Sequence, residues 1–262
     1  GGSGYDTLRV SGSGENLNLS QVSNVSAMAN DGSSRINSIE RIDLGSDTTA
    51  NKLTLTDKDV NDMAGMNLVH TTGASADGKT WTNVGTGAAL ANITTYHQLL
   101  VDGGSNDVVS LKTSIGAWAN VGQVNDGTTN YDVLQNVGTQ SQLIVKSGLS
   151  MYDISSTVAG STTAPMKLNL LGSAMSLDLS AFTAQSEHLS EVDVSGTGAN
   201  TLKINLSDVL SGSPTAKLTV NGNADDFVTL SNGVWTLAST TTAIGTSKAK
   251  PNAKNMLSTK PR

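Results

Sequence analysis

Short stretches in which apolar and polar residues alternate recur along the chain. Alternation predicts a β-strand with one buried and one exposed face, because successive side chains of a strand point to opposite sides of its sheet. Clusters of glycine, asparagine, aspartate and serine separate the stretches and predict tight turns. We therefore expect an all-β fold of many short strands. The alternating stretches include residues 17–19, 42–44, 53–55, 202–206, 218–220 and 228–230.

Four sequence blocks occur twice in the same order, which predicts two copies of one module. A tryptophan follows the last block of each copy, at Trp118 and Trp235. The matched pairs are residues 17–20 with 177–180, 39–46 with 189–196, 50–60 with 199–209, and 99–111 with 218–230. We predict a first module over residues 1–149, a second over 150–239, and a flexible basic tail over 240–262.

Strands separated by turns at short intervals favour a repetitive architecture, in which a parallel β-roll or β-solenoid is preferred and an antiparallel β-sandwich is the alternative. One short helix is expected in each copy. Thr56, with Asp59 three residues later, predicts a helix start, and Asn205 predicts the corresponding start in the second copy. The first module carries extra segments, with a predicted hairpin at Asp77-Gly78 and a hairpin followed by a strand within residues 122–149.

The composition narrows the classes of function. The chain has 262 residues, of which 3% are aromatic and 15% charged, with 27 glycines, and this favours strands and turns over helix. Its formal net charge of -6 argues against nucleic acid as a partner. It has no cysteine, so disulfides and thiolate sites are excluded. No apolar run approaches the roughly 18 to 20 residues of a membrane-spanning helix, so no transmembrane segment is predicted.

The first nine residues, GGSGYDTLR, match the calcium-binding nonapeptide G-G-x-G-x-D-x-U-x, where U is a bulky apolar residue. The glycines expose carbonyl oxygens, the aspartate adds charge, and Ca²⁺ accepts about six to eight such oxygens. The turns at residues 102–107 and 221–226 have similar chemistry without the spacing. They are interpreted either as degenerate calcium turns or as tight turns whose carboxylates cap backbone amides. The predicted metal ligands for Ca²⁺ are Gly1, Gly2, Gly4, Asp6, Asp102, Asp107, Asp225 and Asp226.

No catalytic motif is found. His70, His97 and His188 lie far apart in the sequence, and no serine lies in a G-x-S-x-G motif. Asp43 and Asp193 occupy matching places in the two copies and could form a carboxylate pair, but their alternation with apolar residues favours exposure on the polar face of a strand. The three tryptophans could stack on a sugar, yet two of them, Trp118 and Trp235, recur at one module position, which favours packing.

Together these blocks resemble modules of giant bacterial adhesins of the RTX (repeats-in-toxin) class, which are exported by type I secretion. The resemblance rests on GGSGYDTL, INSIERIDLGS, ANKLTLTDKDV, LLVDGGSNDVVSL and the run from Trp118 to Val145. It implies a secreted, extracellular or cell-surface structural module with calcium as cofactor.

We therefore expect a non-enzymatic structural or adhesive module. Its expected partners are neighbouring repeats, copies of itself, or a cell-surface or polysaccharide ligand. Two alternatives remain open, namely a subunit of an extracellular filament or surface layer (S-layer), and a β-helix enzyme or accessory module acting on polysaccharide.

Overall fold

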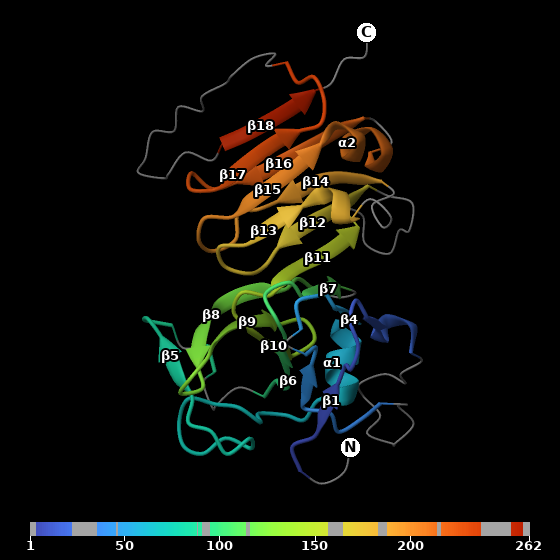
Figure 1. Cartoon of the computed structure of the whole chain (residues 1–262). Helices are drawn as coiled ribbons and strands as arrows, with labels where there is room; N and C mark the ends of the chain where they lie inside the picture. Colours follow the sequence, from blue (N-terminus) through green and yellow to red (C-terminus); the bar gives the residue numbers. More distant parts are fainter. Residues whose placement is uncertain are drawn as a thin grey trace. The chain divides into compact units, whose positions relative to one another are not determined.

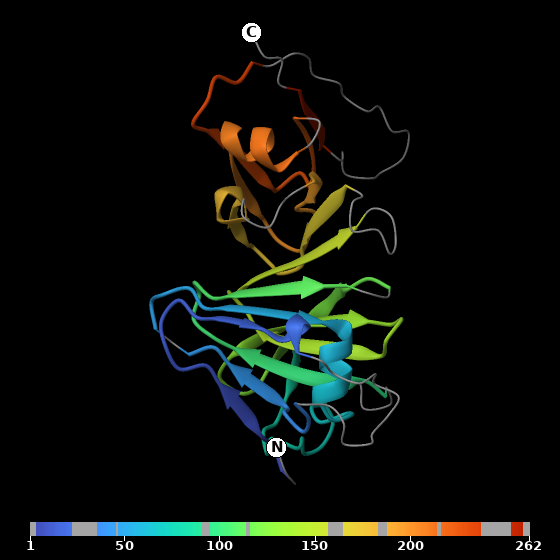
Figure 2. The ribbon, with the colours of Figure 1, turned by 90° about the vertical axis from the view of Figure 1, so that its right-hand side faces the viewer.

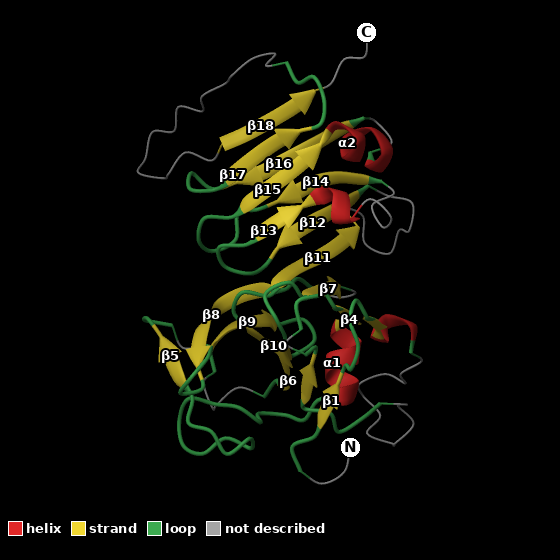
Figure 3. Cartoon of the chain, in the orientation of Figure 1, coloured by secondary structure: helices red, strands yellow, loops and turns green. Residues whose placement is uncertain are grey.

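The computed structural model describes residues 4–22, 36–45, 47–87, 89–90, 95–113, 116–156, 165–182, 188–213, 216–236 and 253–258. The chain divides into two compact units, Gly1–Met151 and Tyr152–Arg262. Strands dominate both units, and the described residues contain two short α-helices (Figure 3). The prediction of an all-β fold is therefore confirmed.

The first unit holds one seven-stranded sheet and a row of three further strands that are not part of it (Figures 1 and 2). The sheet has the order β1-β3-β6-β10-β9-β8-β5; its first four strands are parallel, and the others are antiparallel. The row β2-β4-β7 is parallel. The bounds are β1 (Thr7–Arg9), β2 (Asn16–Asn18), β3 (Arg41–Asp43), β4 (Lys52–Thr56), β5 (Thr82–Val84), β6 (His97–Asp102), β7 (Val108–Lys112), β8 (Ala119–Asn125), β9 (Asn130–Asn136) and β10 (Ser141–Lys146), with helices η1 (Leu19–Gln21) and α1 (Asp57–Met63).

The second unit contains two parallel rows. One row is β12-β14-β16, with antiparallel neighbours β11 and β18, and the other is the three-stranded sheet β13-β15-β17. The bounds are β11 (Ser150–Ser156), which begins at the end of the first unit, β12 (Met166–Leu170), β13 (Ser176–Asp178), β14 (Leu189–Asp193), β15 (Thr201–Asn205), β16 (Lys217–Gly222), β17 (Phe227–Ser231) and β18 (Ala253–Ser258), with helices η2 (Leu179–Phe182) and α2 (Leu206–Gly212).

Consecutive strands add to the two rows in turn. β12, β14 and β16 lie in one row, and the strand that follows each of them lies in the other. Apolar residues come into register across neighbouring strands, as Leu168, Val192 and Val220 do, and all three are buried. Burial of these stacked side chains is the main stabilising contribution to the core. Antiparallel strands extend the row β12-β14-β16 and the parallel strands of the seven-stranded sheet, so those sheets are mixed, whereas β13-β15-β17 contains parallel pairs only.

Both predicted helices form where the capping residues lie. In α1, the Thr56 hydroxyl accepts a hydrogen bond from the Asp59 amide (3.2 Å), and Asp59 Oδ2 accepts one from the Thr56 amide (2.7 Å). In α2, the Asn205 amide donates to Asp208 Oδ2 (2.8 Å). These bonds satisfy amides that a helix start leaves free.

The segment between α1 and β6, which we call the covering segment, lies over one face of the seven-stranded sheet. Trp81 and Leu90 pack there against a cluster that includes Leu100, Val133 and Ile144. The Asp77-Gly78 turn forms, but its predicted hairpin is wrong, because β5 pairs with β8 instead. The hairpin β8–β9 and the following strand β10 are confirmed.

Two side-chain hydrogen bonds attach this segment to the sheet. Gln98 of β6 donates from Nε2 to the Val69 carbonyl (2.9 Å) and accepts from the Val69 amide (2.7 Å). Gln98 also donates to Gln142 Oε1 of β10 (2.9 Å).

The tail departs from its prediction over six residues. Ala253–Ser258 forms β18, which pairs antiparallel with β16 from Lys217 to Gly222. The edge of β16 offers backbone donors and acceptors that an extended segment satisfies whatever its side-chain pattern. The rest of the predicted flexible tail lies outside the described residues.

Candidate functional site

The N-terminal turn is joined through its backbone to the start of β3. The Asp6 amide donates to Glu40 Oε2 (2.7 Å), and the Asp6 carbonyl accepts from the amides of Glu40 and Arg41 (3.1 Å each). Gly4 is exposed and has φ +144°, a conformation that favours glycine. Gly1 and Gly2 lie outside the described residues. The glycine and carboxylate chemistry of this turn fits calcium, and the predicted site stays a prediction.

Asp107 joins two turns of the first unit. Its Oδ2 accepts from the Gly104 amide (2.6 Å), and its Oδ1 accepts from the Asn51 amide (2.8 Å). The Asn51 side chain continues the connection, because Nδ2 donates to the Leu44 carbonyl (2.9 Å) and Oδ1 accepts from the Glu15 amide (2.7 Å). Asp107 and Asn51 are both 1% exposed. Burial raises the pKa of Asp107 above its usual value, although the two amide donors oppose the shift.

Asp226 and Asn200 form the same arrangement in the second unit. Asp226 Oδ2 accepts from the Asn223 amide (2.6 Å), and Oδ1 accepts from the Asn200 amide (2.8 Å). Asn200 Nδ2 donates to the Val194 carbonyl (2.9 Å), and Oδ1 accepts from the Met175 amide (2.9 Å). We call each Asn–Asp pair, Asn51–Asp107 and Asn200–Asp226, a brace.

In both braces, the two carboxylate oxygens accept amide protons. This is the role that the tight-turn interpretation of these segments predicts, and a cation at Asp107 or Asp226 would have to displace those donors. Asp225 is exposed, and Asp102 bonds elsewhere. In the part of the chain that the structure describes, no three histidine, aspartate or glutamate side chains come together as a metal-binding group. The described acids of the predicted set, Asp6, Asp102, Asp107, Asp225 and Asp226, therefore do not gather in a group of three or more.

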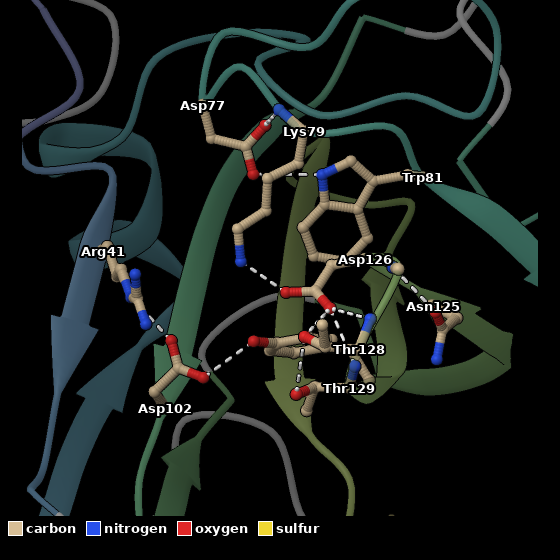
Figure 4. Close-up of polar contacts among 11 residues, drawn as sticks. Arg41, Asp77, Lys79, Trp81, Asp102, Asn125, Asp126, Thr128 and Thr129 are labelled. Atoms are coloured by element: carbon tan, nitrogen blue, oxygen red, sulfur yellow. Dashed lines mark hydrogen bonds and ion pairs between the residues drawn. The ribbon is translucent and has the colours of Figure 1, made fainter.

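Asp102 belongs to a cluster on the covered face of the seven-stranded sheet (Figure 4). Its Oδ2 lies 2.6 Å from Arg41 Nε, and its Oδ1 accepts from the Tyr131 hydroxyl (2.9 Å). Burial, reinforced by Asp102, raises the pKa of Tyr131 well above its usual value. Tyr131 is therefore a neutral donor at physiological pH.

Two further acids bond to residues of the covering segment, and one of them, Asp126, joins it to the turn between β8 and β9 (Figure 4). Asp77 accepts from Trp81 Nε1 (3.0 Å), and the Trp81 ring lies 5.1 Å from that of Tyr131. Asp126 forms an ion pair with Lys79, and its Oδ1 accepts from the amides of Thr128 (3.0 Å) and Thr129 (2.8 Å). Trp81 and Tyr131 are 1% and 2% exposed, so this arrangement joins the segment to the sheet rather than presenting an aromatic surface for a sugar.

The Asp126 contacts predict a pH dependence. Burial would raise the pKa of Asp126, but Lys79 and the Thr128 and Thr129 donors hold it well below its usual 3.8. A carboxyl with a depressed pKa in the folded state stabilises the fold above its unfolded pKa, and this stabilisation is lost as the pH falls. We therefore expect the unfolding temperature to fall below about pH 4, and to fall less steeply in Asp126→Asn. Circular dichroism melts across the acid range measure both slopes; equal slopes would contradict the assignment.

The other candidate residues are placed separately. Asp43 accepts from the Gly45 amide (2.9 Å) and pairs with Arg9, while Asp193 accepts from the Ser195 amide (3.0 Å) and pairs with Lys167. Both carboxylates are partly exposed, as their alternation predicts. The structure places Asp43 in the first unit and Asp193 in the second.

The three histidines are not gathered into one site, and the two remaining tryptophans differ in burial. His70 and His97 lie in the first unit and His188 in the second, and His97 Nδ1 lies 2.8 Å from the Ala64 carbonyl oxygen. Trp118 is buried and Trp235 is half-buried.

Sequence reasoning missed the two asparagines of the braces. A signal was present, because an Ala-Asn pair opens the third repeated block in both copies, at Asn51 and Asn200. Arg41, Lys79 and Asp126 gave no such signal, since their partners are distant in sequence.

Comparison with protein-family models, curated proteins and solved structures finds no match to this chain. Among the described helices, none is long and apolar enough to cross a membrane.

Proposed function

We propose that the chain is a non-enzymatic structural module of a secreted or cell-surface bacterial protein of the RTX adhesin class, with repeated β-roll turns. The observation that carries this proposal is the brace, which has the same hydrogen bonds in both units. It uses carboxylates and amides to join one turn of the chain to the next. A stacked scaffold needs such links, because each turn contacts only its neighbours.

The alternation of strands between two parallel rows supports the β-roll. Each row grows by one strand per turn, with buried aliphatic residues in register. The matching blocks of sequence fall on corresponding elements, with β4–α1 and β15–α2 as the clearest pair. These features fit a repeated module better than an antiparallel sandwich.

Calcium binding at the N-terminal turn is the part of the proposal that is simplest to test. Ligand that binds only the folded state stabilises it by RT ln(1 + [L]/Kd), about 1 to 3 kcal/mol for calcium at ten to a hundred times its Kd. We expect added calcium to raise the unfolding temperature, EDTA to reverse this, and Asp6→Asn to abolish the shift. Glu15→Gln is the control, because Glu15 is an exposed acid outside the set of predicted calcium ligands. An unchanged midpoint in the parent chain would remove calcium from the proposal.

The class of function has its own test. A screen of neutral and acidic polysaccharides for new reducing ends distinguishes a scaffold from an enzyme, and we expect no release. Release that disappears in Asp43→Asn or Asp193→Asn would overturn the proposal and favour the polysaccharide-acting alternative.

A filament or surface-layer subunit is a second candidate. The edge of β17, a strand that pairs only with β15 among the described residues, offers such a subunit one contact with a neighbouring copy, and a polymer needs a second contact elsewhere on the chain. Electron microscopy of the purified chain separates a polymer from a discrete module.

A further inference from the structure

We propose that the edge of β17 is a self-association surface, at which β17 pairs antiparallel with β17 of a second copy. The pairing names the partner of the proposed structural module, so in that respect it deepens the proposed function. Its evidence is independent of calcium and of the repeat, because it rests on the backbone and side chains of one edge strand.

Exposed apolar side chains lie on β17 and in the residues close to it in the sequence. Seven large apolar side chains are exposed in the described part of the chain, and four lie within residues 210–234. Phe227 is 64% exposed on β17 itself, and Val228 is 36% exposed. Val228 lies in register with Leu202, and Leu230 lies in register with Ile204; both partners are fully buried. A strand added beyond β17 would therefore complete the burial of the same apolar rows.

β17 lacks the features that protect edge strands from pairing. Short length, charged side chains and proline discourage the addition of another strand. Edge strands β1 and β13 have three residues each and carry Arg9 and Asp178. β17 has five residues, FVTLS, with neither charge nor proline. Its edge therefore favours the addition of a strand.

In the other row of the second unit, the corresponding strand, β16, does not have a free edge. β16 immediately precedes β17, and its outer side is paired with β18 in antiparallel orientation along its six residues. Because β18 occupies that side, a second copy cannot extend both parallel rows as further turns of a stack. An antiparallel contact that uses β17 alone avoids this obstacle and closes as a two-fold dimer.

The backbone of β17 defines the register of the pair. The Phe227 amide donates to the Asn200 carbonyl, so Phe227 points its backbone groups toward β15. Successive residues of a strand alternate in this direction, so the N–H and C=O groups of Val228 and Leu230 face away from β15. A two-fold axis at Thr229 pairs Val228 of each copy with Leu230 of the other, and both outward-facing residues form reciprocal hydrogen bonds.

This register also keeps the acidic turns apart. Asp225 precedes β17 in each copy, so antiparallel pairing places the two acidic turns at opposite ends of the paired strands. Repulsion between the two acidic turns is therefore screened at physiological ionic strength.

Sedimentation of the full chain, from low micromolar to several hundred micromolar concentration, tests the association. We expect a reversible rise to twice the mass of one chain. Phe227→Lys removes exposed apolar area and adds a charge at the edge, and Val228→Pro removes an outward-facing donor while leaving the bonds to β15 in place. Each should weaken the dimer at least about tenfold. Val137→Lys, at a 70% exposed valine in the first unit, is the matched control and should leave the association unchanged.

A cysteine tests the register even if Val228→Pro disturbs the fold. The chain contains no cysteine. Thr229→Cys would place two sulfurs at a non-hydrogen-bonded antiparallel pair, where Cα atoms lie about 4.5 Å apart and a disulfide can form. We expect a covalent dimer on oxidation of Thr229→Cys, and none for Val137→Cys.

Two results would overturn the pairing. One is a monomer at every concentration, and the other is a dimer that neither responds to Val228→Pro nor crosslinks through Thr229→Cys. Neither result alters the calcium or polysaccharide tests, so failure of the pairing is distinguishable from failure of the proposed function.

Discussion

Replacement of Trp81 by alanine is expected to destabilise the first unit by about 3 to 5 kcal/mol, the usual cost of truncating a buried tryptophan. Trp81 is 1% exposed, contacts the Tyr131 ring and donates to Asp77. Its loss leaves a large cavity beneath the covering segment and an acid without its donor. Urea unfolding, with hydrogen exchange to resolve the two units, measures the change.

Trp81→Phe is the informative comparison. Phenylalanine keeps most of the apolar contact and removes the indole N–H, so we expect a smaller loss of about 1 to 3 kcal/mol. Exchange protection in β15 of the second unit should not change in either variant. Loss of less than about 1 kcal/mol in Trp81→Ala would contradict the assignment of this residue to the core of the covering segment.

The second large effect is expected at the braces. Asp107→Asn replaces one of two acceptor oxygens by an amide group, which then faces a backbone N–H that it cannot satisfy. The same substitution at Asp226 has the same consequence in the second unit. We expect each to cost about 2 to 3 kcal/mol, equally in calcium and in EDTA.

Asp225→Asn is the neighbouring control and should change the free energy of unfolding by less than about 0.5 kcal/mol, because Asp225 is exposed. The design also separates the two interpretations of these turns. A loss that is present in calcium and absent in EDTA would identify Asp107 or Asp226 as a metal ligand. A loss that is present in both conditions identifies the carboxylate as a cap of backbone amides.

The elements that were predicted correctly depend on residues that are close together in the sequence. Thr56 and Asp59 cap α1 across one turn of helix, and the alternation of Ile42 and Leu44 is visible within three residues. Propensity, capping and period are local properties, so they could be inferred from the chain alone. The β8–β9 hairpin was predictable for the same reason.

Features that depend on distant partners were not predictable. The segment before β6 has the turn of a hairpin at Gly78, but β5 finds its partner in β8, which lies much later in the chain. Asp102 was predicted as a metal ligand from its glycine-rich turn, whereas its contacts are Arg41 and Tyr131. Register and pairing across a sheet decide such contacts, and neither is encoded in the sequence around a single residue.

The two braces differ in one respect that bears on how such a chain could change length. Asn51 and Asp107 are 56 residues apart in sequence, and Asn200 and Asp226 are 26 apart, yet the hydrogen bonds are the same. The geometry between turns is thus independent of the length of chain that leaves and returns. Because loop closure costs little for each added residue, the connection after α2 should accept a foreign sequence as readily as the connection after α1 accommodates its long segment. A sequence inserted there would add exposed residues and leave the hydrogen bonds of the braces unchanged.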